Sequence, residues 1–129
     1  MLAHTRFLVH VIDDDEAVRE SLEALLVASG IEAETYCSAE DFLARVQSSH
    51  GCLLLDVNMP GMSGLDLLQN LADQGRQIPV VLLTASPDER IRARAEKLGA
   101  SAYLAKPVTE GDLLRAIAGA VDGNKGSPL

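Results

Sequence analysis

Two patterns of apolar and polar residues alternate along the chain, and the pair of patterns occurs five times. Short apolar runs, several of them rich in β-branched residues, have the length and composition of buried strands. Behind each run comes a longer segment in which apolar residues recur at helical spacing, and three of these segments end at or near a glycine. The runs predict strands at 7–12, 31–36, 52–55, 79–84 and 102–105.

The helical segments carry both an apolar face and recognisable start signals. The first predicted helix places Val18, Leu22 and Leu26 on one face and ends at Gly30. Residues that commonly begin helices precede the other four, namely Ser38, Ser63, Pro87 and Thr109. The inward-facing residues expected in those helices are Phe42, Leu43, Val46, Leu65, Leu68, Ala72, Ile91, Ala95, Leu98, Leu113, Ile117, Ala120 and Val121.

A strand and a helix repeated five times with short connections predict a parallel sheet with right-handed crossovers. The common small solution is an α/β fold, a doubly wound flavodoxin-like (βα)5 sheet with strand order 2-1-3-4-5. The 31–36 segment alternates apolar and polar residues, which favours a sheet edge or a half-exposed strand. Residues 1–121 are expected to form one domain, and residues 122–129 a polar tail or linker stub.

Polar side chains stand where four of the predicted strands end. Asp13 and Asp14 follow the first strand, Asp56 follows the third, Thr84 ends the fourth and Lys106 follows the fifth. In the order 2-1-3-4-5 these strands are neighbours, and their carboxyl ends share one edge of the sheet. We therefore expect the five side chains to converge in a single crevice.

Three carboxylates so close together cannot all stay ionised and unpaired, because burial and mutual repulsion raise their pKa values. A hard divalent cation resolves the conflict, and all-oxygen ligands with room for water suit Mg²⁺. The alternative is a hydrated or protonated acidic patch, but Lys106 and Thr84 at the same place favour the metal. Asp56 is then the candidate nucleophile toward phosphorus, with Lys106 pairing a phosphoryl oxygen and Thr84 donating a hydrogen bond to another.

Bulk composition excludes several classes of function. The net charge is −8 and the basic residues are scattered, so we do not expect this domain to bind nucleic acid directly. No apolar run approaches the length of a membrane span, and the N-terminus lacks the features of a signal peptide, so a cytoplasmic protein without membrane contact is expected. The cysteines Cys37 and Cys52 are too few for a disulfide framework, and Cys52 is expected to be an apolar strand residue.

Four motifs together resemble the receiver domain of two-component response regulators, over residues 7–121. The motifs are Val-Ile-Asp13-Asp14-Asp15-Glu16, Leu-Asp56-Val-Asn58-Met-Pro60-Gly61-Met-Ser-Gly64, Leu-Thr84-Ala85 and Tyr103-Leu-Ala-Lys106-Pro107. The resemblance implies a phosphoacceptor switch in a phosphorelay rather than an enzyme that acts on a separate substrate. Asp56 would accept a phosphoryl group from the phosphohistidine of a sensor histidine kinase or a phosphotransfer protein.

The resemblance also implies roles for the surrounding residues. Asp14 and Asp56 would bind Mg²⁺ directly, with the backbone carbonyl of Asn58, while Asp13 would act through water. Lys106 would bind the phosphoryl group and form a cis peptide with the following proline. Thr84 and Tyr103 would be the switch pair, and Asn58 and Ser86 occupy the two variable positions that tune self-dephosphorylation in the family.

The motifs say less about the output of the domain, that is, about which surface would control a partner. The sequences of these motifs resemble those of transcription regulators that carry a helix-turn-helix output domain. No such domain is present in these 129 residues. Residues 87–98, 102–105 and 109–121 would form the switching face that controls an effector or partner, and phosphorylation would favour a homodimer through it. Val108 stands where the family usually has Phe, which leaves the anchoring of the last helix open.

Two other functions use parts of the same residue set. A phosphohydrolase can combine an Asp nucleophile with Mg²⁺, Thr and Lys, but it usually needs a second acid two residues after the nucleophile, where this chain has Asn58. A receiver-like scaffold that never accepts phosphate would have no need of Asp14 and Lys106 together.

Overall fold

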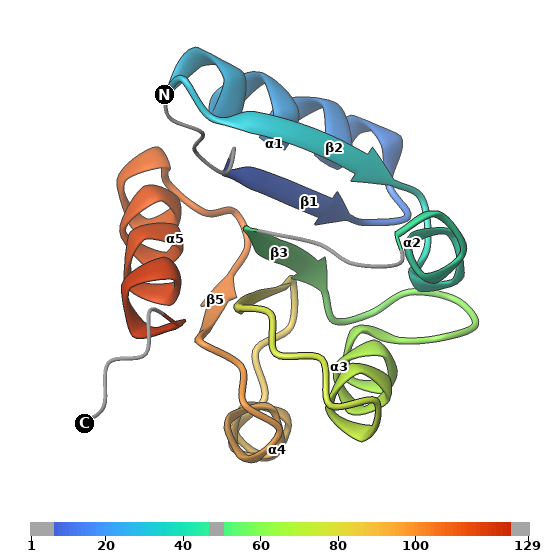
Figure 1. Cartoon of the computed structure of the whole chain (residues 1–129). Helices are drawn as coiled ribbons and strands as arrows, with labels where there is room; N and C mark the ends of the chain where they lie inside the picture. Colours follow the sequence, from blue (N-terminus) through green and yellow to red (C-terminus); the bar gives the residue numbers. More distant parts are fainter. Residues whose placement is uncertain (1–6, 47–50, 125–129) are drawn as a thin grey trace, which may run out of the picture.

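The chain forms one parallel sheet covered by helices on both faces (Figure 1). This computed structural model describes residues 7–46 and 51–124, so the end of the expected tail lies outside the described residues. The elements are β1 (Leu8–Ile12), α1 (Glu16–Ala28), β2 (Glu32–Tyr36), α2 (Ala39–Arg45), β3 (Cys52–Asp56), α3 (Gly64–Asp73), β4 (Val80–Thr84), α4 (Glu89–Lys97), β5 (Ala102–Ala105) and α5 (Glu110–Asn124).

The strand order is β2-β1-β3-β4-β5, and every neighbouring pair is parallel, which confirms the fold predicted from the sequence. β1 separates β2 from β3, so that β2 lies at one edge and β5 at the other. Glu32 and Glu34 of β2 are exposed, in agreement with the alternation expected there. β3 and β4 are buried along their whole length, because each lies between two strands and under helices on both faces.

Alternate residues of β3 enter two separate apolar layers. Leu53 and Leu55 pack with α2, α3 and α4, whereas Cys52 and Leu54 pack with α1 and α5. Figure 1 shows the same division, with α1 and α5 on one side of the sheet and the other three helices on the opposite side. Burial raises the pKa of the Cys52 thiol to about 12, so this residue is an apolar core residue as expected.

The predictions for four helices need correction. α4 begins at Glu89 and not at Pro87, because the Asp88 carboxylate accepts the N–H groups of Arg90 and Ile91 and thereby caps the helix. Ala72 is exposed. Helix α3 begins at Gly64, and from that start its inward face consists of Leu67, Leu68 and Leu71, with Leu65 only partly buried. Val46 caps the end of α2 in an extended conformation, and α5 continues past the expected end at Val121 to Asn124.

The described helices include none with both the length and the apolar content that crossing a membrane requires.

An aromatic cluster fixes α2 against the sheet near the edge strand. The ring of Phe42 meets Tyr36 and His10 edge-on, with ring centroids 5.3 Å and 5.6 Å away. The Tyr36 hydroxyl lies 2.8 Å from His10 Nδ1, and the Arg45 guanidinium lies over the Tyr36 ring. Phe42 is fully buried, so α2 depends on this one side chain for much of its attachment.

We predict that Phe42→Ala lowers the free energy of unfolding by about 3–5 kcal/mol, because it leaves a cavity between α2 and the sheet. Val27→Ala is the matched control, since Val27 is 60% exposed and its truncation should change stability by less than about 0.5 kcal/mol. Urea denaturation followed by circular dichroism measures both. An equal loss for the two variants would contradict this account of the cluster.

Candidate functional site

Four of the predicted residues lie together at the carboxyl edge of the sheet. Asp13, Asp14 and Asp56 each offer a carboxylate oxygen, and these oxygens lie within 4.8 Å of one another. The Lys106 ammonium lies 2.8 Å from Asp13 Oδ2 and 3.2 Å from Asp56 Oδ1. Residues from β3 and from the loops after β1 and β5 thus form one charged group, as the strand order requires.

The run of four acids after β1 is divided by the start of α1. The Asp15 side chain accepts the N–H groups of Ala17 and Val18 and caps the helix, so that it points away from the cluster. Asp13 is 1% exposed, and its Oδ1 accepts the Asp15 N–H at 2.9 Å. Asp14 is exposed. Of the two acids of this run that were expected in the crevice, Asp13 is therefore deep within it and Asp14 lies at its mouth.

Asp56 is the last residue of β3 and is 5% exposed. Burial raises the pKa of its carboxyl above the usual value, the nearby Asp13 charge raises it further, and Lys106 only partly offsets both. Gly64 packs directly on the Asp56 backbone, where an added Cβ would lie 2.3 Å from the carbonyl oxygen. A glycine at this position lets α3 start immediately beside the acid.

Lys106 is fixed from both its backbone and its side chain. Its N–H donates to the Thr84 carbonyl at 2.7 Å, and the Lys106–Pro107 peptide is cis, as the resemblance implied. Burial opposes the charge of the ammonium, but its ion pairs with Asp13 and Asp56 outweigh burial and raise its pKa above the usual value. The ammonium is therefore held in its charged form between two buried carboxylates.

The backbone carbonyl of Thr84 binds Lys106, but among the described residues neither side chain of the predicted switch pair hydrogen-bonds to the charged group. The Thr84 side chain is buried, and its Oγ1 accepts the Ser86 N–H at 3.0 Å. The Tyr103 hydroxyl accepts the Asp88 N–H at 3.2 Å, at the start of α4. Asn58 and Ser86 are exposed.

Sequence reasoning missed three residues that shape the site. Arg19 donates from its guanidinium to the Asp13 carbonyl at 2.8 Å, which fixes the turn after β1. Gly64 provides the close approach described above, and Glu40 of α2 contacts the loop between β3 and α3. Gly61 in that loop and Gly64 at the start of α3 are the sequence signal for close packing, but the sequence pattern does not indicate which partner approaches them.

The carboxylate cluster fits a magnesium ion on the chemistry of its donors. All three side chains offer oxygen, and two of them are buried while Asp14 opens to solvent. Mg²⁺ prefers such a set, because it is usually held by one or two carboxylates and keeps several of its waters. Burial and then the nearby Asp13 charge raise the pKa of the Asp56 carboxyl, and a bound cation would favour its charged form.

We predict that Asp56→Asn stabilises the metal-free protein near pH 7 and raises its Tm, because the variant removes a buried carboxylate that lies beside Asp13. A carboxyl whose pKa is raised in the folded state favours folding below its unfolded pKa, and this contribution is lost as the pH rises through the folded pKa. The advantage of the variant should therefore shrink as the pH falls below the ordinary pKa of an aspartate. Thermal melts of both proteins in chelator from pH 3.5 to 8 test this, and a less stable variant at pH 7 would contradict it.

Comparison with known proteins agrees with this arrangement. The family model described as the response regulator receiver domain matches residues 9–118. The transcriptional regulatory protein FixJ of Azorhizobium caulinodans is 44% identical over 110 residues, which are 84% of this chain and 52% of that protein. The transcriptional regulatory protein TdiR of Thauera aromatica is 42% identical over 91% of this chain and 52% of its own length. The chain thus spans about half the length of these curated relatives.

Solved structures give the same result. The response regulator StyR matches with a TM-score of 0.87 and 43% identity, covering 93% of this chain and 61% of that one. The FixJ-N structure matches with a TM-score of 0.85 and 36% identity, covering 92% of this chain and 96% of its own. A family model that spans most of the chain, close relatives and superposable structures converge on one assignment. The chain belongs to the receiver domain family of two-component response regulators.

Proposed function

We propose that Asp56 accepts a phosphoryl group from a histidine kinase or a phosphotransfer protein, and that the phosphorylated domain switches a partner. Receiver domains are regulatory switch domains rather than classical enzymes, and the family interacts with histidine kinases. The single observation that carries the proposal is the position of Asp56, which ends a buried strand beside two further acids and 3.2 Å from the Lys106 ammonium. A carboxylate in this setting can attack phosphorus while its neighbours balance the charge.

The proposed reaction forms one bond and breaks one. An Asp56 carboxylate oxygen attacks the phosphorus of a phosphohistidine, the P–N bond breaks, and the imidazole leaves with the electron pair. Lys106 pairs with a phosphoryl oxygen of the product, an acyl phosphate. Asp14, Asp56 and the Asn58 carbonyl would hold Mg²⁺, with Asp13 acting through water, and the ion would supply positive charge toward the phosphoryl oxygens.

A hollow beside Lys106 supports docking of a protein donor. It has a volume of about 510 Å³ and opens between α1 and the loop after β5. Its lining is mostly apolar, with Val18, Leu25, Leu83 and Val108 among its residues. Val108 lines the hollow and is smaller than the Phe common in the family at this position, so it fills less of the hollow than a Phe would. An apolar surface next to the acceptor allows a donor protein to bind while it delivers its phosphoryl group.

The proposed switch passes through Thr84 and Tyr103 to the face made by α4, β5 and α5. Thr84 would move toward the phosphoryl group, and the Tyr103 ring would then change its exposure. Tyr103 is already coupled to that face, because its hydroxyl accepts the N–H of Asp88, the residue that caps α4. A new position of the ring changes the support of the first turn of α4, where a partner or a second copy would bind. The exposed Asn58 and Ser86 would set how quickly water removes the phosphoryl group.

We predict that incubation with acetyl phosphate and Mg²⁺ adds one phosphoryl group to the wild type and none to Asp56→Asn. Intact-mass spectrometry measures the adduct, and chelation of Mg²⁺ should prevent it. The matched control is Asp73→Asn, an exposed acid on α3 outside the site, which should be phosphorylated like the wild type. An adduct that persists in Asp56→Asn would contradict the assigned acceptor, and steady donor hydrolysis without any adduct would favour a phosphohydrolase.

We also predict that phosphorylation shifts the protein from monomer to homodimer through the α4–β5–α5 face. Sedimentation velocity of the protein with and without acetyl phosphate and Mg²⁺ measures the shift. Tyr103→Ala should weaken the dimer by about tenfold, since truncation of an interface tyrosine commonly costs more than 1 kcal/mol. The control is Glu20→Ala on α1, which should dimerise like the wild type. A phosphorylated protein that remains monomeric would contradict this prediction.

A further inference from the structure

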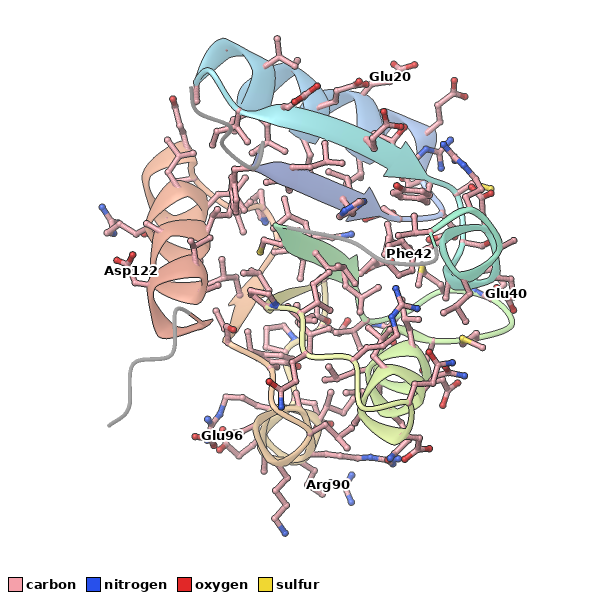
Figure 2. All side chains as sticks on the ribbon, in the orientation of Figure 1. Glu20, Glu40, Phe42, Arg90, Glu96 and Asp122 are labelled. Atoms are coloured by element: carbon pink, nitrogen blue, oxygen red, sulfur yellow. The ribbon has the colours of Figure 1, made fainter. Side chains whose placement is uncertain are left out.

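The loop between β3 and α3, residues 57–63, is held from outside by a side chain of α2. Glu40 Oε2 accepts the backbone N–H of Met62 at 3.1 Å. Figure 2 labels Glu40 at the end of the structure where α2 and this loop meet. Glu40 is exposed and is separated from Met62 by 22 residues, so the contact ties together two segments that the chain does not connect directly.

Gly61 shapes the loop to receive this carboxylate. Its φ of +75° belongs to the left-handed region that glycine adopts without strain. A Cβ at this position would lie 2.9 Å from Glu40 Oε2 and would displace it. The loop therefore has both a donor and an open space at the point where Glu40 arrives.

The same loop carries the Asn58 carbonyl, which is proposed above as a ligand for Mg²⁺. One end of the loop is fixed at the site, since Gly64 packs on the Asp56 carbonyl and donates its N–H to the Val57 carbonyl at 2.9 Å. Met59 is buried in the core. Met62 lies between Met59 and Gly64, so its contact with Glu40 supports the part of the loop between these two anchors.

We infer that Glu40 is a positioning residue for the phosphoryl site, acting through the β3–α3 loop on the Asn58 carbonyl. The inference rests on the proposed function, because it assigns Glu40 a role in metal binding at that same site. A fixed loop presents the carbonyl to the ion without first having to become ordered, so the ion binds more tightly. The carboxylate acts here as a hydrogen-bond acceptor, and its negative charge is not the required property.

Three variants separate this role from a general effect of charge. Glu40→Ala removes the acceptor, Glu40→Gln keeps an acceptor oxygen without the charge, and Glu20→Ala removes an equal charge from the exposed surface of α1. Isothermal titration of the unphosphorylated proteins with MgCl₂ gives the dissociation constant for the ion. Amide exchange measured by NMR reports directly on the Met62 N–H.

Glu40→Ala should raise the Mg²⁺ dissociation constant about three- to tenfold and speed exchange at Met62, while Glu40→Gln and Glu20→Ala stay near the wild type. Phosphorylation of Glu40→Ala by acetyl phosphate should be slow at low Mg²⁺ and recover at saturating Mg²⁺.

An unchanged dissociation constant in a folded Glu40→Ala protein would overturn the inference, even if Met62 exchanged faster. An equal loss in Glu40→Ala and Glu40→Gln would also overturn it, since charge and not the hydrogen bond would then be responsible. A wild type that binds no Mg²⁺ and takes no phosphoryl group would overturn the proposed function and this inference together. A wild type that does both, with Glu40→Ala equal to it, removes only the role of Glu40.

Discussion

The ion pairs of Lys106 with Asp13 and Asp56 are the contacts on which the rest of the site depends. Two carboxylates buried side by side would repel each other strongly without a cation between them. Lys106 comes from the opposite end of the sequence to Asp13, and only the parallel order of the strands brings β5 close enough to β1 and β3. Compensation is incomplete, since the pKa of the Asp56 carboxyl stays above its usual value. The fold thus tolerates a stored electrostatic cost at the place where an incoming cation or phosphoryl group can change it.

The carboxylate cluster is supported by a buried sheet and by separate contacts that hold each of the neighbouring loops. β3 and β4 are enclosed by apolar layers, so the acid at the end of β3 has a firm base. Arg19 fixes the turn after β1, Gly64 allows α3 to begin beside Asp56, and Glu40 supports the loop between them. Each of these contacts involves a backbone group of the loop. This suits a site in which side chains must be free to respond while main-chain positions stay constant.

The strand order and the convergence of Asp13, Asp14, Asp56 and Lys106 could be predicted because both follow from one topological rule for parallel sheets. Local hydrogen bonds were harder to predict. Pro87 suggested the start of α4, but the Asp88 carboxylate can reach two N–H groups and therefore sets the start at Glu89, two residues after the proline. Ala72 fits the helical spacing, yet the start of α3 at Gly64 turns Leu71 inward in its place. The contact of Glu40 with Met62 depends on how α2 is placed by its aromatic cluster, which no pattern along the chain encodes.

The two edges of the sheet have a consequence for how this domain can associate. An open edge strand can pair with a strand of another molecule and so begin aggregation. β2 presents exposed Glu32 and Glu34 along one edge, and β5 at the other edge has four residues and is followed closely by Pro107. Charge discourages strand addition at the first edge, and short length with a missing N–H discourages it at the second. Addition of a strand from a second molecule is therefore disfavoured at both edges of the sheet.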